Sequence, residues 1–191
     1  MKRNSSIKKM TGLSVLTAII IVLQIICTFI KFGPFSITLA LTPIIIGGAI
    51  YGYGAASFLG AVLGAVVFVT GILGWDGGFV NSLMAQNAFA TIFACFFKTI
   101  AAGFLSTAVY RLICKKNEFV SVVCAGFVCP VINTGIFLAV MATFFGAAQG
   151  SGIVNYFIST FVGANFIVEL VTTLVLSSAI HRIIKLGNNI K

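Results

Sequence analysis

The segment AFATIFACFFKTIAAGFLSTAVYRLI, residues 88–113, carries only two charged side chains, Lys98 near its middle and Arg111 near its end. At 1.5 Å per residue, a helix of this length reaches about 39 Å, which exceeds the roughly 30 Å of hydrocarbon in a bilayer. The segment therefore predicts a helix that crosses a membrane and holds one ionisable group at bilayer depth.

The rest of the chain has the same apolar character. Of its 191 residues, 60% are hydrophobic and 8% are charged, whereas soluble domains carry about 25% charged residues. We expect an all-α integral membrane protein with one domain over residues 1–191. Six transmembrane helices are predicted, at about residues 12–30, 37–50, 55–73, 88–113, 119–145 and 153–180. Because these spans leave only short loops, any ATP hydrolysis must come from another chain.

The basic residues predict how the helices are oriented. With six spans, both termini share one side of the membrane, and ten of the 12 Lys and Arg residues lie on that side: Lys2, Arg3, Lys8, Lys9, Arg111, Lys115, Lys116, Arg182, Lys185 and Lys191. Cytoplasmic loops retain Lys and Arg, so both termini are expected in the cytoplasm. Membrane topology thus explains the net charge of +9, and no nucleic-acid partner is expected because the charges form no single basic stripe.

Small residues and prolines predict local features of the spans. Pro43 predicts a kink in the second span, since proline removes a helix hydrogen bond. Ala56, Gly60 and Gly64 recur every four residues, a spacing that lets a neighbouring helix approach closely. Residues 74–87 contain turn-forming glycines and polar side chains, so they predict the longest loop, facing outward.

Catalytic and metal chemistry are disfavoured. The five cysteines include no CxxC pair, and the single histidine, His181, stands among basic residues with no cysteine at ligand spacing. Only three Asp and Glu residues exist in the chain, and motifs such as HExxH or GxSxG are missing. We therefore expect no enzyme activity, no catalytic residues, no metal site and no cofactor.

Polar groups inside three consecutive spans are the candidate functional residues. Lys98 is expected about 15 Å below the outer end of its helix and Glu169 about 24 Å below. Ionisable groups at such depths are costly and mark functional sites by default. Asn133 lies in the span between them, and Asn165 shares a helix face with Glu169 because it precedes it by four residues.

Two interpretations of these groups remain open. They could form a buried network, with Lys98 and Glu169 as an ion pair, that only sets the helix register. Alternatively, they line a pocket that is open to the outside and binds a small polar solute between apolar walls. The expected substrate-binding residues are Lys98, Asn133, Asn165 and Glu169, with Trp75 and Asn87 from the loop above.

Four segments resemble a known family of bacterial membrane proteins. They are ITLALTPIIIGGAIYGYGAASFLGAVLGAV (37–66), FKTIAAGFLSTAVYRL (97–112), PVINTGIF (130–137) and NFIVEL (165–170). In order, spacing and topology they are similar to the substrate-binding (S) components of energy-coupling factor (ECF) vitamin transporters.

The resemblance implies a partner complex in the bacterial cell membrane. An S component binds its vitamin from outside and delivers it inward together with a transmembrane coupling (T) subunit and two cytoplasmic ATPase subunits. In the family, small residues four apart on the first helix contact the coupling subunit. Ser14 and Ala18 occupy that position here, with Ser where the family usually has Ala.

The substrate and two rival functions stay open at this point. Pantothenate is favoured, since Lys98 suits its carboxylate and the asparagines suit its amide and hydroxyls, and riboflavin is the alternative vitamin. An autonomous secondary transporter could use Glu169 as a cation site, although such proteins often show internal repeats that are not obvious here. A structural membrane subunit would need the buried ion pair only for packing.

Overall fold

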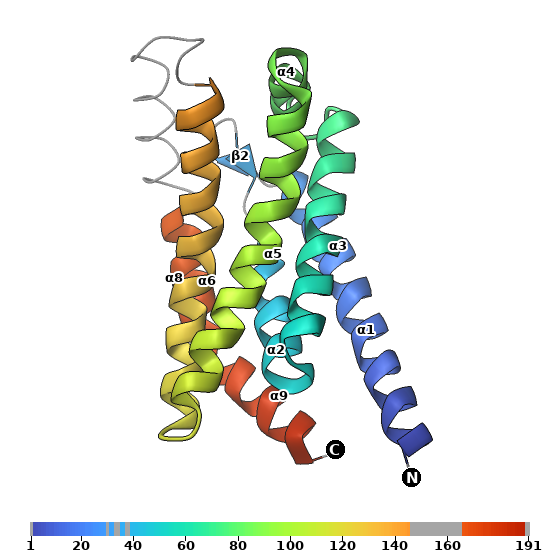
Figure 1. The fold of residues 1–191 in the computed structure, drawn as a ribbon, viewed down its shortest axis with the longest axis vertical. Coiled ribbons are helices and arrows are strands. Elements are labelled where there is room, and N and C mark those ends of the chain that lie inside the picture. Colours follow the sequence, from blue (N-terminus) through green and yellow to red (C-terminus); the bar gives the residue numbers. More distant parts are fainter. Residues whose placement is uncertain (1, 30, 33–34, 37–38, 146–165, 190–191) are drawn as a thin grey trace.

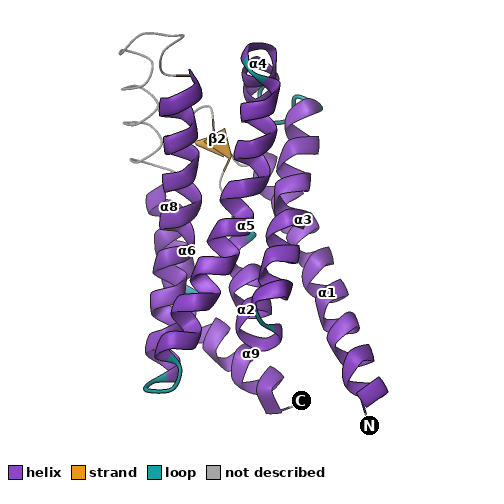
Figure 2. Ribbon diagram, in the orientation of Figure 1, coloured by secondary structure: helices purple, strands orange, loops and turns teal. Residues whose placement is uncertain are grey.

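A computed structural model describes residues 2–29, 31–32, 35–36, 39–145 and 166–189. Helices dominate these residues (Figure 2), and two short antiparallel strands lie between the first two helices along the chain. The elements in chain order are α1 (Lys2–Phe29), β1 (Lys31–Phe32), β2 (Phe35–Ser36), α2 (Leu41–Tyr51), α3 (Tyr53–Ile72), α4 (Phe79–Gln86), α5 (Ala88–Ile113), α6 (Glu118–Val140), η1 (Met141–Phe145), α8 (Phe166–Val175) and α9 (Ser177–Asn189).

Several of these helices are long and apolar enough to cross a membrane. Within the described residues, four single helices meet that condition: Ile7–Phe29, Tyr53–Ile72, Ala88–Ile113 and Glu118–Phe145. The pair α8 and α9 meets it jointly, although the two are bent by 50° at their junction. The fold is therefore that of an all-α membrane protein with four or five candidate spans.

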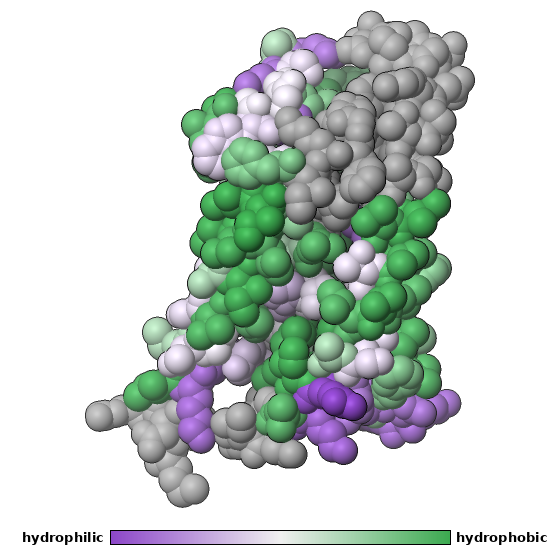
Figure 3. Space-filling model, turned by 180° about the vertical axis from the view of Figure 1, so that it is seen from behind, coloured by the Kyte–Doolittle hydropathy of each residue, from purple (hydrophilic) through white to green (hydrophobic). Residues whose placement is uncertain are grey.

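The bundle has two distinct ends. Both chain termini lie at one end, and α4 lies at the other (Figure 1). We call these the terminal end and the α4 end. The surface seen from behind is hydrophobic through the middle and hydrophilic at the terminal end (Figure 3). Exposed basic side chains belong to this end: Lys8, Lys9, Arg111, Lys115, Lys116, Arg182 and Lys185.

The second helix is shorter than the sequence suggested. It begins at Leu41 instead of residue 37 and has 11 residues, or about 16 Å, too little to cross a bilayer alone. Pro43 does not kink it, because it lies in the first turn, where a missing N–H costs no helix hydrogen bond. A short antiparallel hairpin, with Phe32 opposite Phe35, precedes it.

The expected loop at residues 74–87 contains a helix, α4. The Asp76 carboxylate starts it by accepting hydrogen bonds from the backbone N–H groups of Gly78 at 2.9 Å and Val80 at 2.8 Å. The Asn81 side-chain amide then donates to the Ile72 carbonyl at 3.1 Å. Local capping therefore outweighs the turn propensity of the glycines.

The first and last spans also differ from expectation. The first helix extends back to Lys2 through the basic segment that precedes the apolar run, since lysine and arginine are good helix formers. For the last span, residues 146–165 lie outside the described part of the chain. The described remainder of that span consists of α8 and then α9, which turns away from α8.

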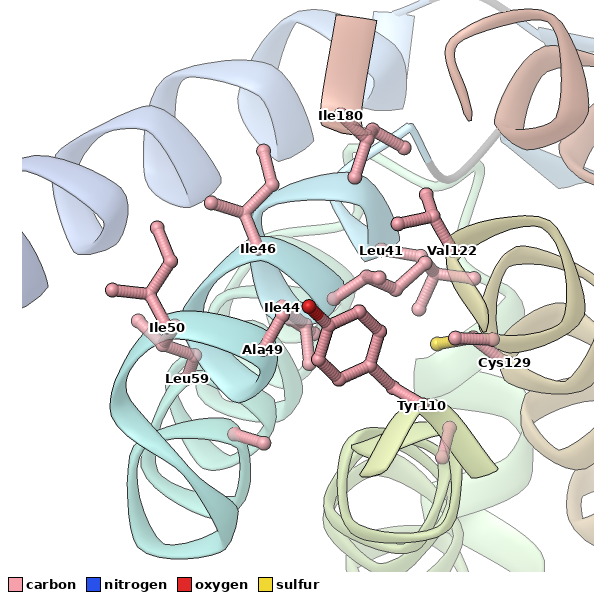
Figure 4. Close-up of a cluster of buried hydrophobic side chains, with 14 of the residues drawn as sticks. Leu41, Ile44, Ile46, Ala49, Ile50, Leu59, Tyr110, Val122, Cys129 and Ile180 are labelled. Carbon is pink, nitrogen blue, oxygen red and sulfur yellow. The ribbon is translucent and has the colours of Figure 1, made fainter. Parts of the chain in front are cut away.

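Buried apolar side chains from six of the described helices fill the terminal half of the bundle. Figure 4 shows part of this group, with α2 at its centre. We call it the core cluster; its members include Ile20 of α1, Leu41 and Ile44 of α2, Leu59 and Leu63 of α3, Ala102 and Tyr110 of α5, Cys129 of α6, and Ile180 and Ile184 of α9.

Helices α3 and α5 meet backbone to backbone. A Cβ atom added at Gly60 would lie 2.5 Å from the Thr99 carbonyl oxygen, and one at Gly64 would lie 2.8 Å from the Cys95 carbonyl oxygen. Gly103 faces the Ala56 carbonyl from the other side, at 2.8 Å. The small-residue spacing on α3 thus serves packing within the chain, as predicted.

We expect Gly60→Ala to lower the melting temperature of the detergent-solubilised protein. The added methyl group must push two helix backbones apart, and overpacking of this kind costs about 1–3 kcal/mol. Gly54→Ala is the matched control: no atom lies within 4 Å of a Cβ there, and alanine favours helix over glycine. Equal melting temperatures for the two variants would show that the close contact does not support the fold.

Candidate functional site

A second apolar cluster lies toward the α4 end, apart from the core cluster. We call it the α4 cluster; it comprises Leu83, Ala90, Ala94, Phe137, Val140, Met141 and Phe145, with Phe79, Ile136 and Leu138 packed against it. Helices α5 and α6 contribute to both clusters. On each of them, polar residues lie between the clusters.

Three helices place a strongly polar side chain one turn beyond a core-cluster residue, in the direction of the α4 end. On α1, Gln24 follows Ile20 by four residues, and on α6, Asn133 follows Cys129 by four. Helix α5 runs in the opposite direction, so Lys98, four residues before Ala102, also lies one turn toward the α4 end. Residues four apart share a helix face. With Thr99 and Thr134, these three side chains form what we call the polar layer.

The amide side chains of the polar layer are buried. Gln24 is 2% exposed and Asn133 5%, while Lys98 is half-buried. Among the described residues, no group hydrogen-bonds the side-chain carbonyl oxygens of Gln24 and Asn133. The Thr99 hydroxyl, by contrast, donates to the Phe96 carbonyl in its own helix at 3.0 Å. A buried acceptor without a hydrogen-bond donor lowers the stability of the fold. The layer is therefore suited to a bound solute that donates hydrogen bonds.

An aromatic ring holds the Lys98 ammonium. Its Nζ atom lies 4.7 Å from the centroid of the Phe137 ring, and that ring contacts Phe79 of α4 at a centroid distance of 6.3 Å. A cation over an aromatic face is stabilised by the ring quadrupole. The contact keeps the positive charge at the boundary between the polar layer and the α4 cluster, where an anionic group could reach it.

Glu169 of α8 is 2% exposed, whereas Lys98 is half-buried. The Glu169 carboxylate is within electrostatic range of the Cys129 thiol, which interacts with the Ser106 hydroxyl. Phe137 lies against the Lys98 ammonium, and the ion pair of Lys98 with Glu169 that the sequence suggested stays a prediction.

Trp75 and Asn87 lie at the α4 end, away from the polar layer. The Trp75 ring is 40% exposed and contacts the Phe29 ring at the end of α1, with centroids 5.5 Å apart. The Asn87 side-chain oxygen accepts a hydrogen bond from the Ala90 N–H at 3.0 Å. Asn87 is therefore the N-cap of α5, and its predicted contact with a solute stays a prediction.

Of the six predicted site residues, Lys98 and Asn133 lie on the neighbouring helices α5 and α6, each one turn from a core-cluster residue, and their contact with a solute stays a prediction. Asn165 lies outside the described residues, and its role stays a prediction. Sequence reasoning missed Gln24, which belongs to the apolar run expected as the first span. Its signal was available: a glutamine within such a run is as unusual as the asparagines that were singled out.

We expect Asn87→Ala to destabilise the protein by about 1 kcal/mol, because an N-cap oxygen satisfies an otherwise unpaired helix N–H. Asn87→Ser, which preserves a capping oxygen, should melt within a degree or two of the unmodified chain. Thermal unfolding in one detergent checks both variants. If alanine and serine proved indistinguishable, the capping role would be wrong.

Comparison with known proteins identifies the family of this chain. A sequence profile for the family "ECF transporter, substrate-specific component" matches residues 8–186. The chain is also 30% identical over 179 residues to the pantothenic acid transporter PanT of Lactococcus lactis subsp. cremoris (strain MG1363), an alignment that covers 88% of this chain and 89% of PanT. The profile match extends over every residue of the polar layer. This multi-pass protein of the cell membrane belongs to the family of substrate-specific components of ECF transporters.

Proposed function

We propose that this chain is the substrate-binding subunit of an ECF-type importer and captures pantothenate outside the cell. The observation that carries the proposal is the polar layer: Lys98 and Asn133 lie between the two apolar clusters on their helices, and the buried Gln24 lies one turn beyond the core cluster on α1. The similarity to a pantothenic acid transporter supports the choice of vitamin. Ligand sites of this kind combine apolar walls with a few polar groups that set orientation.

The polar groups of pantothenate match those of the polar layer in kind. Its carboxylate would meet the Lys98 ammonium, and its amide and two hydroxyls would meet Asn133 and its neighbours. Phe137 and Phe79 would form the apolar wall on the α4 side. Asn165 and Trp75 are proposed as further contacts at the α4 end, and Glu169 as a polar group beneath the bound vitamin.

Six membrane crossings with cytoplasmic termini belong to the same proposal. The described helices supply up to five candidate spans, and α2 with the sequence before it would supply the sixth. The exposed basic side chains at the terminal end favour the cytoplasm for that end. The α4 end would then face outward, and Lys98 would lie about 15 Å below the outer end of α5.

Lys98→Met tests the carboxylate contact. We expect pantothenate affinity, measured by calorimetry on the purified protein, to fall about 10- to 100-fold, because hydrogen bonds to charged groups are worth about 1.5–3 kcal/mol. Affinity for pantothenol, in which an alcohol replaces the carboxylate, should change little. The unmodified protein should prefer pantothenate to pantothenol.

Three results would speak against this assignment. If the unmodified protein binds riboflavin and not pantothenate, the vitamin is wrong. An equal loss for both ligands in the Lys98 variant would mean that the lysine supports the fold instead of the carboxylate. Pantothenate uptake in cells that lack the coupling and ATPase subunits would favour an autonomous transporter.

Partner binding is proposed on α1. Ser14 and Ala18 are both exposed, and the Ser14 hydroxyl donates to the Met10 carbonyl of its own helix at 3.0 Å. The serine therefore presents a small surface with its polar group already satisfied. Small side chains four apart permit close helix packing in a membrane, so this face would receive the T subunit, which joins the chain to two ATPases.

Ser14→Trp should abolish copurification with coexpressed T and ATPase subunits while leaving pantothenate affinity unchanged, since the bulky ring keeps the partner helix away. Val175→Trp is the matched control, because Val175 is 72% exposed on α8, away from α1. Recovery of the intact complex with Ser14→Trp would remove α1 from the interface.

A further inference from the structure

Two buried amide side chains of the polar layer each have a carbonyl oxygen without a hydrogen-bond donor among the described residues. In the described part of the chain, the Gln24 Oε1 and Asn133 Oδ1 atoms have no hydrogen-bond partner, although both residues are at least nine-tenths buried. Carbonyl oxygens can only accept hydrogen bonds. Neither a carboxylate nor a hydrocarbon surface can satisfy them, because neither offers a donor.

The two amides occupy equivalent positions on different helices. Each lies one turn past a core-cluster residue, Gln24 past Ile20 on α1 and Asn133 past Cys129 on α6. Helix α2, which packs against both α1 and α6, contributes to the core cluster from its first residue, Leu41. Both acceptors thus lie toward the α4 end from core-cluster residues, on two helices that α2 contacts.

The partner of Gln24 is not a neighbour in its own helix. The Thr28 hydroxyl, one turn away, donates to the backbone carbonyl of Gln24 at 2.7 Å, so it does not serve the side-chain oxygen. At bilayer depth no bulk water replaces a missing donor. A donor that arrives with the substrate would remove this cost on binding.

We infer that Gln24 and Asn133 determine specificity by accepting hydrogen bonds from the substrate. This inference rests on the proposed function and narrows its ligand class to a carboxylate whose other end bears at least two donors, hydroxyl or amide N–H. Carboxylates of equal size without such donors leave both oxygens unpaired and are rejected. Gln24 therefore extends the site onto α1, a helix that contributes none of the predicted solute contacts.

A comparison of two ligands and two variants tests the role of Gln24. The ligands are pantothenate and its analogue with both hydroxyls replaced by hydrogen, titrated calorimetrically into the purified full-length protein. The unmodified chain should prefer pantothenate at least tenfold. Gln24→Met, which matches the glutamine in length, should lower pantothenate affinity about tenfold and change that of the analogue less than twofold.

Thr28→Val is the matched control, since it removes another buried polar group from the same helix, one whose hydroxyl is satisfied within the chain. It should leave both affinities unchanged. If Gln24→Met does not fold stably enough to be purified, Gln24→Asn can replace it. Its side chain is one methylene shorter, so the oxygen lies farther from the substrate and the preference for pantothenate should likewise fall. Melting temperatures separate loss of fold from loss of contact.

The outcomes distinguish this inference from the proposed function. If the unmodified chain binds pantothenate and the Gln24 variants keep its full preference over the analogue, the inference is overturned and the proposed function stands. Equal weakening of both ligands by the Gln24 variants also overturns it. If the unmodified chain binds neither ligand, the proposed function fails and the inference fails with it.

Discussion

A polar atom buried at bilayer depth needs a hydrogen-bond partner inside the protein, because hydrocarbon provides none. Many buried hydroxyls in this chain meet the requirement locally: those of Thr99, Thr107 and Thr173 donate to carbonyls in the preceding turn. In the longer amide side chains of Gln24 and Asn133, the carbonyl oxygen has no hydrogen-bond donor within the described part of the chain. The polar layer is thus suited to a substrate that donates hydrogen bonds to these two oxygens.

The two halves of the bundle are packed by different elements. In the terminal half, α2 and the core cluster fill the space between the longer helices (Figure 4), and the glycine contacts lock α3 against α5. Toward the α4 end, α2 is no longer present, and the hairpin and α4 take part instead (Figure 1). The packed terminal half is a suitable support for a binding layer, since packed neighbours hold its side chains in place.

Helix α1 is the element on which the proposed activities meet. It directs Gln24 toward the bundle interior, and its exposed face carries Ser14 and Ala18. A solute that engages Gln24 would therefore contact the same helix that the coupling subunit is proposed to contact.

Apolar length and charge distribution by themselves determined the class of protein, the long helices α5 and α6, and the candidates Lys98 and Asn133, because each depends on local composition. Tertiary structure alone decided that Phe137 lies beside Lys98, that Asn87 caps a helix, and that the side chain of Gln24 is buried. These outcomes depend on the relative depth and facing of helices distant in sequence. Spacing along one helix sets which residues share a face, but only packing against the neighbours decides what that face meets.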